Sequence, residues 1–276
     1  MDSLPFAKMS GSGNDFIIID NRQGIVTGED PGRFAVQVCR RRMSVGADGL
    51  ILVENAAQAD FQWRFYNSDG SVAEMCGNGA RCVARFAHLN GIAGERMRFE
   101  TLAGIISAQV MGDQVKIQMT DPTDLTLAAE LQTPQGRQTY SSVNTGVPHV
   151  VIEVDDLAQM DVPSAGRPIR RHPRFAPAGT NVNFTAPVGT NRWAVRTYER
   201  GVEDETLACG TGITATALVL AAQNALTSPI ELQSRSGCLL KVHFTLKGQS
   251  FKDVFLEGDA RLIYEGRLNV EAWHYA

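Results

Sequence analysis

Residues 74–81 read EMCGNGAR, and residues 207–214 read LACGTGIT. In both stretches a Cys-Gly-x-Gly turn leads into a run of small or helix-forming residues. A glycine directly after the cysteine lets the backbone approach a ligand closely, and the second glycine permits a tight turn. A helix that begins at such a turn directs its unpaired N–H groups and its positive end toward the cysteine. Each turn is therefore a candidate anion site beside a thiol whose thiolate form is favoured.

The residues around the two turns repeat as well. A strand pattern at Arg64–Asn67 precedes Cys76, and a similar one at Arg196–Glu199 precedes Cys209. A repeat of this length indicates two halves related by duplication, with the chemistry expected between them. Each half has one segment of strong helical character followed by a run of strands: 80–89 and then 97–119 in the first half, and 214–224 and then 230–263 in the second.

Composition and charge exclude several classes of protein. The chain has 276 residues, of which 43% are apolar and 20% charged, a composition typical of a globular protein. Its net charge of −4 does not indicate a nucleic-acid surface. No run of residues is apolar enough to span a membrane or to act as a secretory signal. Five cysteines in a chain without an export signal favour reduced thiols and a cytoplasmic location.

Two duplicated cysteines allow three kinds of chemistry. A redox dithiol normally shows a C-x-x-C motif, which is absent, and a zinc site needs further His or Cys ligands close by. The third possibility is acid–base catalysis from two sides, in which a thiolate removes a proton from one face of a carbon and a thiol delivers one to the other face. Cys39, Cys82 and Cys238 lack the Gly-rich context and are interpreted as ordinary packing residues.

The longest motif carries a resemblance to a known family. Asn67-Ser68-Asp69-Gly70-Ser71, followed after four residues by Cys76-Gly77-Asn78-Gly79-Ala80-Arg81, resembles the signature of diaminopimelate epimerases. The resemblance runs through most of the chain. Further matching stretches are Lys8–Phe16, Gly146–His149, Gly179–Phe184 and Glu199–Thr206.

The resemblance implies a fold and an activity. Such enzymes convert LL-2,6-diaminopimelate to the meso form in lysine and peptidoglycan synthesis, with no cofactor and no metal. It implies an α/β (α+β) fold of two pseudo-symmetric halves, each a mixed sheet wrapped around a central helix. With a boundary at the polar break after residue 121, we expect residues 1–121 plus 263–276 to form the half with Cys76, and residues 122–262 the half with Cys209. It also implies a homodimer whose ligand is a small molecule, with no nucleic acid or membrane as partner.

Carried over residue by residue, the resemblance also implies roles. Cys76 and Cys209 would be the acid–base pair, assisted by His149 and Glu199. The charged pair Glu199 and Arg200 suits the distal ammonium and carboxylate of the substrate. The remaining substrate-binding positions would be the backbone groups of Gly77, Asn78, Gly210 and Thr211 and the side chains of Asn14, Asn67 and Asn181.

Two positions depart from the family pattern, and two other readings stay open. Val147 stands where the family often has Asn, with Asn144 nearby as a substitute, and Gly49 stands where it often has Gln. A related racemase of proline or hydroxyproline also has paired cysteines, but typically with His at the position of Asn78 and without the pair Glu199 and Arg200. The other alternative is a binding or redox protein that keeps the fold without the catalysis.

Overall fold

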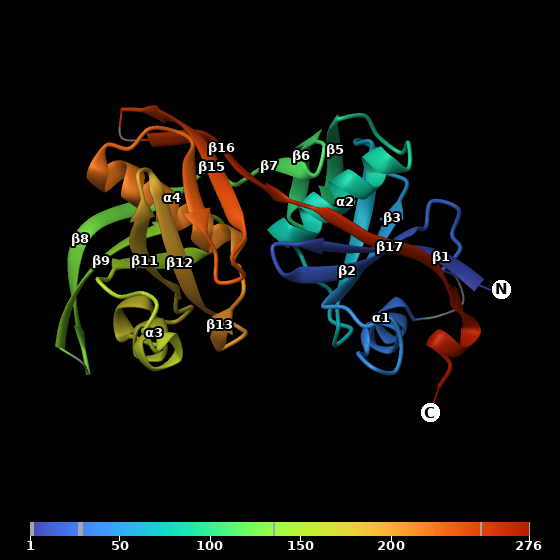
Figure 1. Cartoon of the computed structure of the whole chain (residues 1–276), viewed down its shortest axis with the longest axis horizontal. Coiled ribbons are helices and arrows are strands. Elements are labelled where there is room, and N and C mark those ends of the chain that lie inside the picture. The colour runs from blue at the N-terminus through green and yellow to red at the C-terminus, as the bar shows by residue number, and fades with distance from the viewer. Residues whose placement is uncertain (1–2, 27–29, 135, 249, 276) are drawn as a thin grey trace. The chain divides into compact units, whose positions relative to one another are not determined.

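The computed structural model describes residues 3–26, 30–134, 136–248 and 250–275 (Figure 1). The chain forms two compact units. Unit 1 comprises residues 1–117 and 258–276, and unit 2 comprises residues 118–257. These limits differ from the expected 121 and 263. The N–H of Met119 donates to Val254 O inside unit 2, and the N–H of Ala260 donates to Asp113 O inside unit 1, so the chain changes unit a few residues earlier at both crossings.

The described residues of unit 1 form eight strands and two α-helices. The strands pair in the order β17, β1, β2, β3, β4, β5, β6, β7, and only the β2–β3 and β4–β5 pairs are parallel. Helix α1 connects the first parallel pair and helix α2 connects the second. The elements are β1 (Ser3–Gly11), β2 (Asn14–Asp20), α1 (Pro31–Cys39), β3 (Gly49–Glu54), β4 (Phe61–Asn67), α2 (Gly77–Leu89), β5 (Arg96–Thr101), β6 (Gly104–Met111), β7 (Gln114–Gln118), β17 (Arg261–Asn269) and the short 3-10 helix η2 (Val270–Ala272).

Unit 2 repeats the same plan. Its strands pair in the order β8, β9, β10, β11, β12, β14, β15, β16, again with only the third and fifth pairs parallel, and α3 and α4 connect those two pairs. The elements are β8 (Thr123–Thr133), β9 (Gly136–Asn144), β10 (Pro148–Glu153), α3 (Val162–Arg170), the 3-10 helix η1 (Pro173–Phe175), β11 (Asn181–Gly189), β12 (Arg192–Glu199), β13 (Asp204–Thr206), α4 (Gly210–Asn224), β14 (Ile230–Gln233), β15 (Leu239–Lys247) and β16 (Ser250–Asp259). The identical order of pairings is what a duplicated half requires.

In each unit the sheet wraps around one central helix. Helix α2 packs against β1, β2, β3, β6 and β17, and α4 packs against β8 to β12, β14 and β15. Residues 213–221 of α4 are buried on every side, which is expected of a helix enclosed by a sheet. The second helix of each unit covers the outside: α1 packs on β3 and β4, and α3 on β11 and β12.

The sequence pattern does not predict α1 or α3, and it predicts only a domain boundary at the polar segment that follows residue 121. Helix α1 is capped by Asp30, whose side chain accepts from the Gly32 N–H, and α3 is capped by Asp161 in the same way through Ser164. Helix α3 contains Gly166, which alone would disfavour a helix. There a Cβ atom would lie 2.5 Å from the Tyr198 side chain, so close packing on β12 decides the local structure. Residues 124–133 and 136–139 lie in the antiparallel β8–β9 pair.

Candidate active site

Each unit places one duplicated cysteine at the N-cap of its central helix. Cys76 precedes α2 with φ −147° and ψ 117°, and Cys209 precedes α4 with φ −113° and ψ 108°. Both are extended cap residues, so the N–H groups of the next residues, Gly77 and Asn78 in one unit and Gly210 and Thr211 in the other, open toward the cysteine. The helices begin earlier than the sequence suggested, at Gly77 and Gly210.

In unit 1 the predicted residues Cys76, Asn78 and Asn14 lie together. The Cys76 Sγ accepts from the Gly79 N–H at 3.5 Å. The Asn78 Nδ2 donates to Asn14 Oδ1 at 2.6 Å, which joins the first turn of α2 to the start of β2. A chain of polar contacts therefore surrounds the helix N-terminus on the side of the strands.

Asn67, also predicted for unit 1, ends β4 opposite Gly49. Its Nδ2 donates to Ser71 Oγ at 2.9 Å, in the turn that follows the strand. The described hydrogen bonds join it to that turn and not to Asn14 or Asn78. A role for Asn67 in substrate binding stays a prediction.

In unit 2 the predicted residues come from the ends of neighbouring strands. His149 at the start of β10 pairs in register with Asn181 at the start of β11. The Asn181 Oδ1 accepts from the backbone N–H of Arg200 at 2.8 Å, so the strand start holds the residue that follows β12. The Thr145 Oγ1 donates to Thr211 O at 3.1 Å and ties the first turn of α4 to the same edge.

Glu199 is the acid group beside Cys209. Burial raises the pKa of the Glu199 carboxyl above its ordinary value, and this outweighs the opposing effect of hydrogen bonds from Thr206 and Cys209. The Thr206 Oγ1 lies 2.8 Å from Glu199 Oε2, and Cys209 Sγ lies 3.5 Å from Thr211 Oγ1. The hydrogen bond between Cys209 and Glu199 lets the thiol and the carboxyl share a proton.

His149 is fully buried, and burial lowers its pKa to about 3, so the imidazole is neutral near pH 7. The Asn183 Nδ2 lies 3.1 Å from His149 Nδ1. Since the same Nδ2 is an amide donor, Nδ1 accepts and the ring proton is on Nε2. Among the described residues, no hydrogen-bond partner is found for that buried Nε2. The ring therefore presents an N–H donor.

The sequence did not single out several polar residues that hold these groups in place. Asn183 fixes the tautomer of His149, and Thr206 binds Glu199. Asn183 could have been found from the pattern Asn181-Val182-Asn183, in which both amides lie on one face of a strand. Thr206 closes the β12–β13 pair through its partner Thr197, which only the tertiary structure reveals.

The two departures from the family pattern have local explanations. A Cβ atom at Gly49 would lie 2.5 Å from Cε2 of Phe65, so a longer side chain there would need Phe65 to move. Asn144, considered as a substitute for the family Asn at Val147, uses its Oδ1 to accept from the Gly146 N–H at 3.0 Å. Its side chain thus closes the turn before β10.

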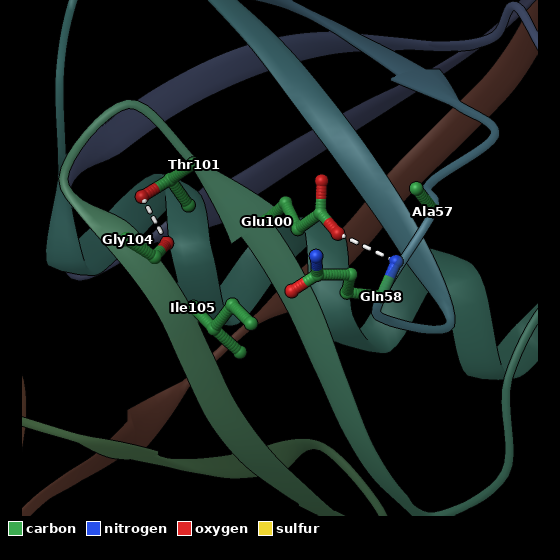
Figure 2. Close-up of a pocket in the computed structure, with 6 residues that line it drawn as sticks. All are labelled: Ala57, Gln58, Glu100, Thr101, Gly104 and Ile105. Carbon is green, nitrogen blue, oxygen red and sulfur yellow. Dashed lines mark hydrogen bonds between the residues drawn. The ribbon is translucent and has the colours of Figure 1, made fainter.

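A pocket of about 300 Å³ lies elsewhere in unit 1, at the turn between β5 and β6 (Figure 2). Its polar groups bind one another: the Gln58 N–H donates to Glu100 Oε1 at 2.8 Å, and the Thr101 Oγ1 donates to Gly104 O at 2.8 Å. None of its lining residues is a predicted site residue. The pocket is therefore not part of the candidate active site.

Comparison with known proteins identifies the family. A family model described as diaminopimelate epimerase matches residues 6–125 and 141–263. Among relatives, the diaminopimelate epimerase of Aquifex aeolicus is 46% identical over 99% of this chain and 100% of its own length. The diaminopimelate epimerase of Archaeoglobus fulgidus is 40% identical over 99% of each chain.

Solved structures confirm the predicted fold class. A phenazine biosynthesis protein of the PhzF family from Bacillus anthracis matches with a TM-score of 0.74 at 15% identity, covering 98% of this chain and 100% of that one. A probable proline racemase from Agrobacterium radiobacter matches with a TM-score of 0.69 at 16% identity, covering 99% and 96%.

Two further findings concern the described part of the chain alone. No group of three or more His, Cys, Asp or Glu side chains there is arranged to hold a metal ion. None of its helices combines the length and the apolar character that crossing a bilayer demands. Taken with the duplicated cysteine turns, the family model and the relatives establish that this chain is an isomerase that belongs to the diaminopimelate epimerase family.

Proposed function

We propose that this protein converts LL-2,6-diaminopimelate to meso-2,6-diaminopimelate by a two-base mechanism, as a step in lysine and peptidoglycan synthesis. The observation that carries the proposal is the duplicated N-cap cysteine, found at the same position of two helices in units of identical topology. Inversion of a stereocentre needs one base and one acid on opposite faces of the carbon, and two thiols can exchange these roles.

The reaction proceeds by proton transfer at the α-carbon. One cysteine, as thiolate, removes the α-proton and becomes a thiol. The electron pair left on carbon is delocalised into the adjoining carboxylate, and the other cysteine, as thiol, returns a proton to the opposite face and becomes the thiolate. The N–H groups at the two helix N-termini stabilise the extra negative charge on that carboxylate.

Unit 2 supports the discrimination between diaminopimelate and a simpler amino acid. Glu199 and Arg200 provide a carboxylate and a guanidinium for the ammonium and the carboxylate at the distal end of the substrate. Asn181 fixes the backbone of Arg200 through its N–H. A monoamino acid such as proline has no distal groups for this pair to bind.

His149 and Glu199 assist proton transfer in this proposal. Glu199 exchanges a hydrogen bond with Cys209 and can take part in the movement of its proton. His149 contributes a neutral imidazole with an N–H donor at Nε2. Cys76 uses the Gly79 N–H and the positive end of α2 to favour its thiolate form.

The proposal also includes a homodimer in the cytoplasm. On β17, Leu262, Ile263 and Tyr264 are 37%, 51% and 44% exposed. Long strands with exposed apolar residues are normally covered in native proteins. A second copy of the chain is the partner we propose for this strand. In sedimentation experiments the wild-type protein should be a dimer and Ile263→Asp a smaller species. Identical profiles for the two proteins would contradict the proposed dimer interface.

The test of the activity is proton NMR of LL-diaminopimelate with the reduced protein in deuterium oxide. Appearance of the meso product with deuterium at the inverted α-carbon is the expected result. Absence of both exchange and product would exclude this substrate. Proline would then be the next amino acid to test, because the rival racemases act on it.

A further inference from the structure

A chain of four hydrogen-bonded side chains runs along the N-terminus of α2. The Arg81 Nη2 donates to Asn78 Oδ1 at 2.8 Å, the Asn78 Nδ2 donates to Asn14 Oδ1 at 2.6 Å, and the Asn14 Nδ2 donates to Asp48 Oδ2 at 3.0 Å. Arg81 is fully buried and Asn78 nearly so, whereas Asp48 lies close to the surface. The chain thus leads from the core of unit 1 outward.

The two end residues of this row of hydrogen bonds determine which side chain donates and which accepts at each step. A guanidinium can only donate hydrogen bonds, and a carboxylate can only accept them. The two amides between them can turn either way, because an amide group both donates and accepts. Because Arg81 can only donate, Asn78 must turn its amide oxygen toward Arg81. Because the Asp48 carboxylate can only accept, Asn14 must turn its amide nitrogen toward Asp48.

Both ends are themselves held in place. Arg81 also donates to Asp259 O at 3.2 Å and to Ser12 Oγ at 2.8 Å. The Asp48 Oδ2 also accepts from the Asp15 N–H at 3.2 Å, and the Asp48 N–H donates to Asp15 O at 2.9 Å. Neither end group can therefore rotate away without breaking other contacts.

We propose that Arg81 and Asp48 are positioning residues that orient the amides of Asn78 and Asn14 so that both present N–H donors to the substrate. The Nδ2 of Asn78 and the Nδ2 of Asn14 each use one hydrogen to donate to the next side chain in this row. The second hydrogen of each has no acceptor among the hydrogen bonds of the described residues, so it remains for an anionic ligand. This inference rests on the proposed function, because it takes Asn14 and Asn78, which the family resemblance assigns to substrate binding, to contact the dicarboxylate substrate.

The test is a series at position 48, chosen because this side chain is partly exposed and its loss does not open a cavity. Asp48→Asn keeps an acceptor but loses its charge and adds a donor, and should raise KM for LL-diaminopimelate about fivefold. Asp48→Lys can only donate and opposes the direction set by Arg81, and should raise KM about fiftyfold. The kcat should change little, since the loss is in binding.

Two variants separate positioning from structural support. Arg41→Gln removes the ion-pair partner of Asp48 but leaves the carboxylate facing Asn14, so KM should stay at the wild-type value. Asp48→Glu keeps an acceptor-only end and should recover most of the affinity. A merely structural role would lower the fraction of active protein, and hence the apparent kcat, in all variants alike.

A measurement without substrate distinguishes this inference from the proposed function. In ¹⁵N-labelled protein, the side-chain amide signals of Asn14, assigned by their loss in Asn14→Ala, should shift in Asp48→Lys and not in Arg41→Gln. If they shift as expected but the wild type fails to turn over diaminopimelate, only the proposed function is wrong. Equal KM values and equal amide spectra across the position-48 series would overturn the inference.

Discussion

The N-terminal turns of α2 and α4 have the same backbone and different chemical surroundings. Cys76 is half-buried and accepts a backbone N–H from Gly79. Cys209 is 8% exposed, makes no cap hydrogen bond with its side chain, and shares a hydrogen bond with the half-buried Glu199 carboxyl, whose pKa is raised. The two units thus place the thiol at the same backbone position, but they surround it with different hydrogen-bonding groups.

The largest effect should come from removing either thiol. If both cysteines act on one carbon, Cys76→Ala and Cys209→Ala should each lower kcat/KM for epimerisation about 1,000-fold or more, because no other base replaces the missing one. Activity is measured by NMR as above. Cys238→Ala, a cysteine outside both turns, is the control and should retain wild-type activity. An active variant at either turn would show that one unit suffices for catalysis.

Glu199→Gln tests whether unit 2 depends on its carboxyl. The variant should lose about 100-fold in kcat/KM, since Gln can neither take up the proton nor balance an ammonium. The raised pKa means that the wild-type carboxyl becomes neutral at a higher pH than an ordinary glutamate. The wild-type kcat/KM should therefore fall as the pH drops through that raised pKa, and this fall should be missing in Glu199→Gln.

The control for Glu199 is Glu231→Gln, which removes the same charge from an exposed ion pair with Arg192 in the same unit. Its activity and pH profile should match those of the wild type. Identical pH profiles for the wild type and Glu199→Gln would mean that another group controls the acidic side, and the contrast between the two turns would then lie elsewhere.

Matched glycines compare how tightly the two turns are packed. Gly79 and Gly212 are both the third residue of their helices. A Cβ atom at Gly212 would lie 2.3 Å from Asn183 Oδ1, whereas one at Gly79 would lie 3.3 Å from Ile51 Cδ1. Gly212→Ala should cost about 3 kcal/mol of unfolding free energy. Gly79→Ala should change it by less than about 1 kcal/mol, because helix propensity offsets the contact.

Urea unfolding at pH 7 measures both glycine variants. Asn183 cannot easily move aside, because its Nδ2 donates to Val150 O at 2.8 Å and its Oδ1 accepts from Thr197 at 2.9 Å. Equal losses in the two variants would indicate that the two turns are packed alike despite their different neighbours.

The smallest effect is a loss of stability on acidification that comes from the buried His149 of unit 2. The unfolded chain protonates His149 near the ordinary pKa of 6.5, but burial keeps the native ring neutral down to about pH 3. Between these values the unfolded state binds more protons, so stability falls as the pH falls below 6.5. At pH 5 this loss should be about 2 kcal/mol relative to pH 7. His149→Asn, which keeps an acceptor for Asn183, should lose less unfolding free energy between pH 7 and pH 5. An equal loss in the variant and the wild type would mean that other groups cause the acid sensitivity.

Sequence reasoning found the parts of this molecule that depend on local signals. The Gly-rich turns, the two central helices and the duplication follow from residue type and spacing, and the sequence pattern also predicts the strands at 64–67 and 196–199, which lie in β4 and β12. Helices α1 and α3 were missed because each has only nine residues, and the glycine and proline within α3 conceal its pattern. Their stability comes from packing on the sheet, which no local pattern records.

The same distinction holds for the candidate site. Residues within the motifs were found, since the chemistry of Cys, Glu and Arg can be read from their types. The partners that orient these residues were not found. Asp48 lies far from Asn14 in sequence, and Asn183 lies far from His149, so each pair meets only when the strands pair. Arg81 lies inside the longest motif, yet nothing in its sequence position shows that it is fully buried.

The return of the last strand to unit 1 has a consequence for the order of synthesis. Unit 2 is one continuous segment, so all of its residues are synthesised before β17. Unit 1 must wait, because β1 lacks its neighbour β17 and the Arg81 guanidinium lacks the Asp259 carbonyl until the end of translation. The half of the protein that is begun first is thus completed last, and the edge of β1 that later pairs with β17 stays without that partner through most of the synthesis of the chain.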